Sequence, residues 1–163
     1  MSLGGVWLIE LTQEQEERVT TLANEMVAAG ISLMIAAGNS AAYGTIGTPG
    51  AAKDVITVGA TEDSRQLAVY SSKGPTHEGQ IKPNVAAIGS AVMSVEAEGT
   101  GEPAYDSNGS PNGYTSMSGT SMATPMVAGM AVLLHQANPD LQPLMIRSIL
   151  ETTAEYRLSL IHI

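Results

Sequence analysis

The first part of the chain carries apolar residues at the spacing of one helix face. These residues are Val19, Leu22, Ala23, Met26 and Val27. Thr12 and Gln15 precede them in the arrangement of a capping box, and Gly30 follows them as a stop signal. The pattern therefore predicts one amphipathic helix that ends at Gly30.

Two uninterrupted apolar runs follow this helix, at residues 32–37 and 54–60, and a loop rich in Gly and Pro separates them. Short apolar runs bounded by turn residues are typical of strands that are buried on both faces, as in parallel sheets. A helix followed by two such strands predicts an α/β fold with a doubly wound, mainly parallel sheet flanked by helices.

The second half alternates short strand-like pieces with polar loops and then becomes helical. We expect strands at residues 68–71, 85–88, 91–95 and 114–117, and an exposed excursion at 96–112, which is rich in Gly, Ser and Pro. A helix is expected at residues 121–136, where Asn138 and Pro139 stop it. Another is expected at 141–152 with Pro143 in its first turn. No internal repeat or linker divides the chain.

Composition narrows the classes of partner. The chain has 163 residues and a net charge of −9 with only 7 Lys and Arg, which argues against binding to nucleic acid or to an anionic membrane. It contains no Cys, so disulfides and thiol catalysis are excluded. Its longest apolar stretches, residues 31–37 and 126–134, are far shorter than the roughly 20 residues that cross a bilayer. The start of the sequence has no signal-peptide pattern.

The segment with the clearest chemistry is residues 117–129, Met-Ser-Gly-Thr-Ser-Met-Ala-Thr-Pro-Met-Val-Ala-Gly, where a strand passes through Gly119 into a helix. A serine at a helix N-terminus is exposed and lies where negative charge is favoured. Gly-Thr-Ser alone is more typical of a simple helix cap. The complete run, however, resembles the active-site serine signature of the subtilisin-like serine protease family. That resemblance implies that Ser121 is the nucleophile. The run departs from the signature at Met126, where many members carry a His outside the triad.

Further blocks resemble the same family in the same order. Residues 36–39, Ala-Ala-Gly-Asn, are similar to the block whose Asn donates to the oxyanion, although Gly-Asn alone is more often a turn. The resemblance gives Asn39 that role and places Ala37 and Gly38 in substrate binding. Residues 47–60 resemble the block that puts Gly47 at the floor of the S1 pocket. Residues 72–75 and 81–85 resemble later segments.

At the front of the chain, Ser2, Leu3 and Gly4 resemble the strand that lies beside the substrate and forms one wall of S1. The resemblance extends over residues 2–157. We therefore interpret residues 1–157 as the C-terminal portion of a subtilisin-like peptidase domain and residues 158–163 as a non-native tail.

The family's triad follows the chain order Asp, His, Ser, so both partners of Ser121 are expected upstream of Met1. None of the three histidines replaces the missing base. His135 lies about 21 Å along the helix from Ser121, at 1.5 Å per residue. His77 belongs to a polar loop, and His162 belongs to the tail. The isolated chain is therefore expected to be inactive, and its missing partner is the N-terminal half of the same domain.

The resemblance implies a secreted serine endopeptidase that binds an extended protein or peptide substrate and needs no cofactor for catalysis. It also implies structural calcium. The backbone carbonyls of Gly50, Ala52 and Val55 match a weak cation site of the family, whereas no carboxylate cluster supports a strong one.

Two other interpretations stay open at this stage. The chain could be a non-catalytic relative or an inactive fragment, which the upstream DNA would decide by showing or lacking the Asp and His blocks. It could instead be a nucleotide-binding α/β domain with residues 38–50 as a phosphate loop, but neither the Rossmann glycine spacing nor a Walker motif occurs.

Overall fold

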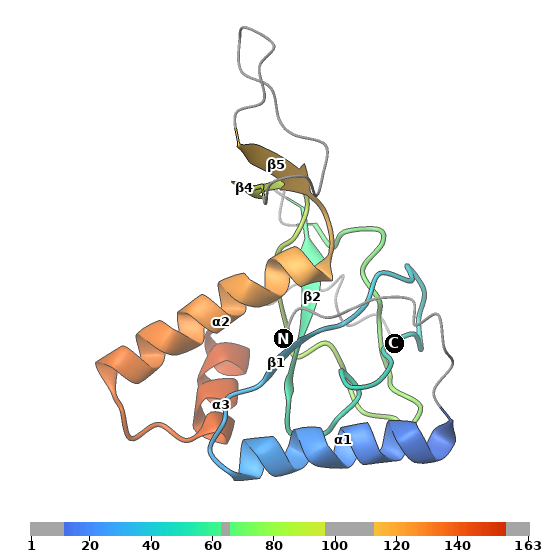
Figure 1. The fold of residues 1–163 in the computed structure, drawn as a ribbon, viewed down its shortest axis with the longest axis vertical. Coiled ribbons are helices and arrows are strands. Elements are labelled where there is room, and N and C mark those ends of the chain that lie inside the picture. The colour runs from blue at the N-terminus through green and yellow to red at the C-terminus, as the bar shows by residue number, and fades with distance from the viewer. Residues whose placement is uncertain (1–11, 63–65, 97–112, 156–163) are drawn as a thin grey trace, which may run out of the picture.

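A parallel sheet of three strands forms the centre of the molecule. The computed structural model describes residues 12–62, 66–96 and 113–155. Strands β1 (Met34–Ala36), β2 (Ile56–Thr61) and β3 (Val85–Ile88) lie side by side in the order β1-β2-β3 (Figure 1). Met34 pairs with Ile56, and Val58 pairs with Val85. The predicted α/β class with a mainly parallel sheet is confirmed.

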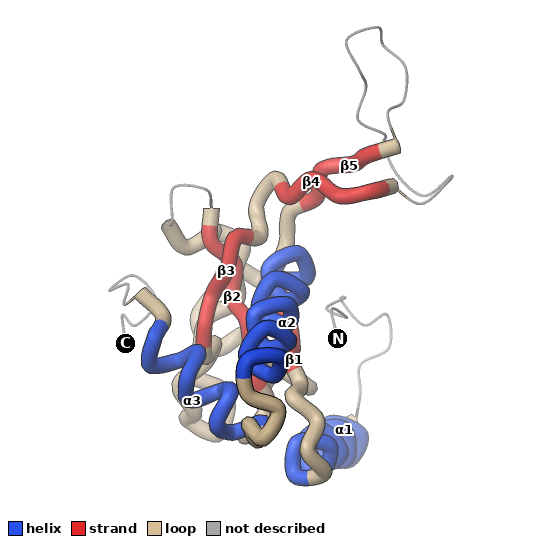
Figure 2. The backbone as a smooth tube through the Cα atoms, turned by 90° about the vertical axis from the view of Figure 1, so that its left-hand side faces the viewer, coloured by secondary structure: helices blue, strands red, loops and turns tan. Residues whose placement is uncertain are grey.

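Three helices cover this sheet. They are α1 (Gln13–Ala28), α2 (Thr120–Ala137) and α3 (Pro143–Thr153), close to the predicted ranges. Helix α1 begins with the expected capping box, in which the Thr12 hydroxyl accepts from the Gln15 N–H (3.3 Å) and the Gln15 side chain accepts from the Thr12 N–H (2.9 Å). Helix α2 runs along the sheet and contacts all three strands (Figure 2).

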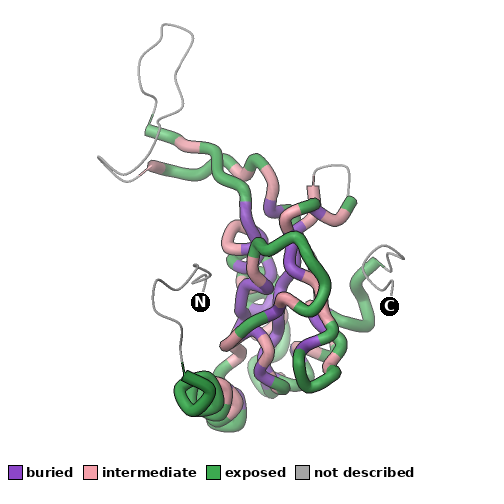
Figure 3. Tube along the Cα trace, turned by 90° about the vertical axis from the view of Figure 1, so that its right-hand side faces the viewer, coloured by how far each residue is buried: buried purple, intermediate pink, exposed green. Residues whose placement is uncertain are grey.

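The core consists of two clusters on opposite sides of β1. Met34 packs with α2, α3 and the β2 side chains, whereas its neighbour Ile35 packs with α1, because successive side chains of a strand point to opposite faces. The larger cluster is Met34, Ile56, Val58, Ala60, Ala68, Ala123, Val127, Ala131, Ile146 and Leu150. Figure 3 shows the buried sheet beside an α1 whose outer face is exposed. The sheet is therefore covered from both sides, as a doubly wound fold requires.

A second, antiparallel pair of strands projects from this body (Figure 1). It consists of β4 (Val92–Val95) and β5 (Tyr114–Met117), and Val92 pairs with Met117. Both strands were predicted. None of the helices in the described ranges is both long and apolar enough to cross a membrane.

The strand predicted at residues 68–71 is wrong. This segment turns, because the Ser71 N–H donates to the carbonyl oxygen of Ala68 (2.9 Å). The Ser71 hydroxyl is fully buried and accepts from the N–H of Ala60 (3.1 Å). A serine side chain that bonds to backbone in this way replaces ladder bonds, which is why the apolar run does not become a strand.

Candidate active site at the carboxyl edge of the sheet

The start of α2 meets the carboxyl ends of β1 and β3. Gly119, the N-cap residue of α2, donates its N–H to the carbonyl oxygen of Gly89 (2.8 Å), which directly follows β3. A Cβ atom on Gly89 would lie 2.7 Å from the carbonyl oxygen of Gly119 and 2.8 Å from the Cβ of Ala60. The absence of a side chain at Gly89 thus allows the helix that carries Ser121 to approach the sheet.

Asn39 is held by the first residue of this helix. Its Oδ1 accepts from both the N–H and the hydroxyl of Thr120, each at 3.0 Å. Because a backbone N–H can only donate, the atom that faces it has to be the amide oxygen. The amide nitrogen therefore occupies the other side, where an added Cβ on Gly119 would lie 3.2 Å from it. The orientation of the Asn39 amide is fixed, with its donor beside the Gly119 backbone.

Thr120 joins the start of α2 to Gly38 and Asn39 and was not singled out by the sequence. It is fully buried, and its hydroxyl accepts from the Gly38 N–H (3.2 Å) in addition to its bond with Asn39. Gly119 provides no side-chain cap, so Asn39, which lies 81 residues before Thr120, caps the helix instead. The only signal for this role in the sequence was the position of Thr120 next to Ser121. The run Gly-Thr-Ser, however, is also compatible with an ordinary helix cap.

Ser121 lies in the first turn of α2 and is half-buried. The dipole of a helix favours negative charge at its N-terminus, where Ser121 lies. Of the two histidines in the described ranges, His135 lies in the last turn of α2 and His77 lies in an exposed turn. A serine, an oriented amide donor and a helix N-terminus are thus brought together at one edge of the sheet.

The structure also brings Ala37 and Gly38 to this edge. Ala37 continues the pairing of β1 with a bond from its N–H to the carbonyl oxygen of Val58 (2.9 Å). Gly38 has a φ of +102°, and a Cβ there would lie 2.9 Å from the Ser72 hydroxyl oxygen, so only glycine fits without strain. Its carbonyl oxygen accepts from the Ser72 N–H (2.9 Å). These contacts fix the backbone that leads into Asn39.

Gly47 lies in the loop between β1 and β2 and is exposed, and its carbonyl oxygen accepts from the Ala51 N–H (3.0 Å). The predicted substrate-binding residues Ser2, Leu3 and Gly4 lie outside the described residues, as do His162 and the tail at residues 158–163.

The carbonyls proposed for a weak cation site belong to the loop between β1 and β2. Those of Gly50 and Val55 accept hydrogen bonds from the Thr57 hydroxyl (2.6 Å) and the Lys82 ammonium group (2.9 Å), respectively. Ala52, the third of these residues, is fully buried. Within the described ranges, no three His, Cys, Asp or Glu side chains gather in a way that could hold a metal ion.

Comparisons with known proteins point to one family. The sequence model of the Subtilase family (peptidase S8) matches residues 1–161. Serine protease AprX of Bacillus subtilis (strain 168) is 39% identical over 160 residues, which are 93% of this chain and 36% of AprX. Subtilisin E of the same strain is 33% identical over 159 residues, which are 96% of this chain and 35% of that protein.

Among solved structures, Sphericase aligns with a TM-score of 0.71 at 32% identity, over 93% of this chain and 46% of that chain. The chain thus spans about a third of the length of these two curated relatives and just under half of that solved chain. The relatives are subtilisin-like serine proteases, and the shared region contains the sheet edge described above. This chain belongs to the subtilase family of serine peptidases.

Proposed function

We propose that this chain carries the nucleophile and the oxyanion donor of a subtilisin-like serine endopeptidase, and that sequence N-terminal to it supplies the Asp and His of the triad. The observation that carries the proposal is the contact between Asn39 and Thr120. It joins the amide at the end of β1 to the start of the helix that holds Ser121. Two segments that are far apart in sequence thereby form one site.

The reaction follows from the roles of these groups. The Ser121 oxygen attacks the scissile carbonyl carbon while the His accepts the hydroxyl proton, and the carbonyl oxygen becomes an oxyanion. When the C–N bond breaks, the same His returns the proton to the leaving amine. Water then hydrolyses the acyl-enzyme by the same route and regenerates the Ser121 hydroxyl.

Asn39 and the backbone N–H of Ser121 stabilise the oxyanion. Because Thr120 holds Oδ1, the Nδ2 donor is oriented before the substrate arrives, and no reorganisation is needed as charge develops. The N-terminus of α2 adds a favourable field for the same charge. The arrangement therefore supports stabilisation of the transition state more than ground-state binding.

The substrate is a protein or peptide in an extended conformation. It would pair its backbone with Ser2–Gly4, which also form one wall of the S1 pocket, while Gly47 lies at the floor of that pocket and Ala37 and Gly38 contact the substrate. Family resemblance favours secretion of the complete enzyme. The nucleotide-binding alternative receives no support, because the Gly38 N–H, which a phosphate loop would need, donates to Thr120 instead.

Casein hydrolysis by the complete reading frame tests this proposal. Wild type and Ser116→Ala, which changes an exposed serine of β5, should cleave casein, and Ser121→Ala should not. A complete reading frame that lacks the upstream Asp and His, or that cleaves casein equally well without the Ser121 hydroxyl, would refute it.

A further inference from the structure

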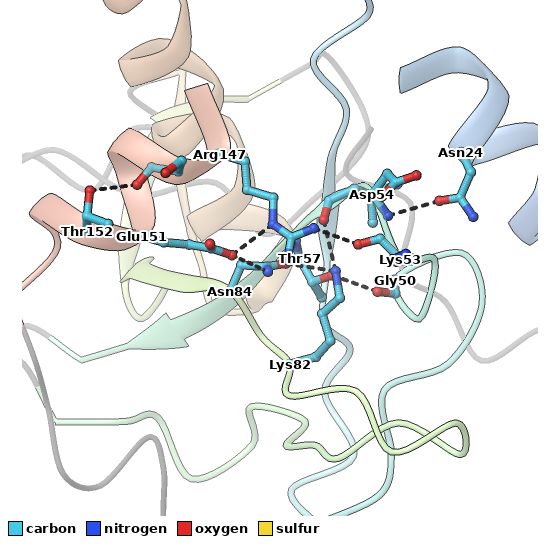
Figure 4. A network of polar contacts seen from close by, with 12 residues as sticks. Asn24, Gly50, Lys53, Asp54, Thr57, Lys82, Asn84, Arg147, Glu151 and Thr152 are labelled. Carbon is cyan, nitrogen blue, oxygen red and sulfur yellow. Dashed lines mark hydrogen bonds and ion pairs between the residues drawn. The ribbon is translucent and has the colours of Figure 1, made fainter. Parts of the chain in front are cut away.

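Lys82 places an ammonium group inside the protein, at the amino edge of the sheet and away from Ser121. Its side chain belongs to a residue that is only 4% exposed. The ammonium nitrogen donates to the carbonyl oxygen of Val55 (2.9 Å), which precedes β2, and to the Oδ1 of Asn84 (2.8 Å), which precedes β3 (Figure 4). One buried cation thus joins the segments that lead into two neighbouring strands.

The oxygen partners of Lys82 are themselves held in place. Asn84 Oδ1 also accepts from the Thr57 N–H (2.8 Å), and Asn84 Nδ2 donates to Glu151 Oε1 (2.6 Å). Glu151 in turn accepts from Arg147 Nε (2.9 Å), and Arg147 reaches the carbonyl oxygen of Lys53 (2.6 Å). Figure 4 shows this network between α3, the loop before β2 and the segment before β3. The ammonium group therefore has fixed and specific partners.

The residues present do not fit the weak cation site that the family resemblance implies. Calcium requires several oxygen ligands that converge on one point. Of the three carbonyls expected to provide them, that of Gly50 accepts from the Thr57 hydroxyl and that of Val55 accepts from the Lys82 ammonium group. A calcium ion on the Val55 oxygen, at its usual distance of about 2.4 Å, would lie within roughly 5 Å of that ammonium charge. The two cations would repel each other in a poorly hydrated environment.

We propose that the ammonium group of Lys82 takes the place of a bound cation at this end of the sheet, so that the carbonyl of Val55 and the side chain of Asn84 need no metal ion. The inference does not rest on the proposed protease function. A primary ammonium group and a potassium ion are similar in size and both bind carbonyl oxygens. The lysine has the advantage that it is covalently attached and does not have to be captured from solution.

Burial and the neighbouring charges act on the protonation of Lys82 in opposite directions. Glu151 and Asp54 favour the charged form, whereas burial, which is the largest effect, and Arg147 disfavour it. Together they lower the pKa of Lys82 to about 7. The test is therefore made below pH 7, where the ammonium form is present.

The test replaces Lys82 with Met, which keeps the unbranched side chain as far as Cε but lacks the terminal ammonium group and its charge. Thermal unfolding of the complete reading frame is measured in potassium chloride and in tetramethylammonium chloride at equal ionic strength, with calcium held constant. Wild type should unfold at the same temperature in both salts. Lys82→Met opens the position and should unfold about 5 °C higher in potassium than in tetramethylammonium. Lys53→Met is the matched control, because it removes an exposed lysine of the neighbouring loop and should show no such difference.

Two results would overturn the inference. One is a potassium effect of the same size in wild type and in Lys82→Met, and the other is no potassium effect in either. If Lys82→Met does not fold in tetramethylammonium chloride, refolding in potassium chloride decides the question. Recovery of the folded protein supports a vacated cation position, and failure in both salts contradicts it.

Discussion

The two polar ends of Asn39 have different duties, and Asn39→Asp separates them. Oδ1 caps α2 by accepting two hydrogen bonds from Thr120, whereas Nδ2 is the proposed oxyanion donor. Asp retains an oxygen for the cap, and a carboxylate is favourable near a helix N-terminus. The free energy of unfolding should therefore change by less than about 1 kcal/mol. Asn39→Ala removes the cap as well and should lower it by about 1–2 kcal/mol.

The effect of the two Asn39 substitutions on kcat should differ from their effect on stability. Loss of one oxyanion donor costs about 10²–10³-fold in kcat, a value carried over from subtilisin itself, and Asn39→Ala should lose at least this much. Asn39→Asp should lose as much or more, because its negative charge faces the developing oxyanion. KM should change little, since the donor acts mainly in the transition state.

Steady-state hydrolysis of a chromogenic peptide and thermal unfolding of the complete reading frame give both quantities. Asn24→Asp is the control. The Asn24 Oδ1 accepts from the Asp54 N–H (3.0 Å) away from the site, so this variant should keep normal kcat. Near-normal kcat in Asn39→Asp would refute the donor role. A loss of stability in Asn39→Asp as large as in Asn39→Ala would refute the separation of the two duties.

Three further outcomes are expected. The isolated 163-residue chain should not cleave casein measurably, because the triad His is proposed to lie in sequence N-terminal to it and loss of that histidine costs about 10⁶-fold in subtilisin; cleavage that disappears in Ser121→Ala would contradict this. The same chain exposes apolar side chains on two helices, Val132 and Leu133 on α2 and Leu144 and Met145 on α3. It should therefore bind a hydrophobic dye and aggregate. A sharp, reversible unfolding transition of a monomer would contradict this expectation. Burial lowers the pKa of Lys82 from 10.5 to about 7, so the folded state binds fewer protons than the unfolded state between these values. The free energy of unfolding of wild type, relative to Lys82→Met, should therefore rise with pH across this window and be lowest below it, and urea titrations that show a flat difference would contradict this.

Local patterns were sufficient to predict the helices. The capping box at Thr12 and Gln15, the proline stop after α2 and Pro143 at the start of α3 act within a few residues, and each element begins or ends close to the expected position. The strands were less well defined. The apolar run at residues 32–37 forms a strand only at Met34–Ala36, because pairing with β2 sets its length.

The contacts that make the site could not be derived from local patterns. The bond between Asn39 and Thr120 joins residues 81 positions apart, and it arises only when the sheet brings β1 beside the start of α2. Family resemblance identified Asn39, but not the residue that orients it. Lys82 stands in a segment that was recognised as family-like, yet nothing in the neighbouring residues indicated that the sheet would bury it.

Covalent labelling of the nucleophile tests the central claim most directly. A fluorophosphonate reacts with a serine only when a base and an oxyanion site activate its hydroxyl. The complete reading frame should gain one adduct, which peptide mass spectrometry should locate at Ser121, and Ser121→Ala should gain none. An enzyme that cleaves casein while Ser121 stays unlabelled, or that carries its adduct on another serine, would contradict the account.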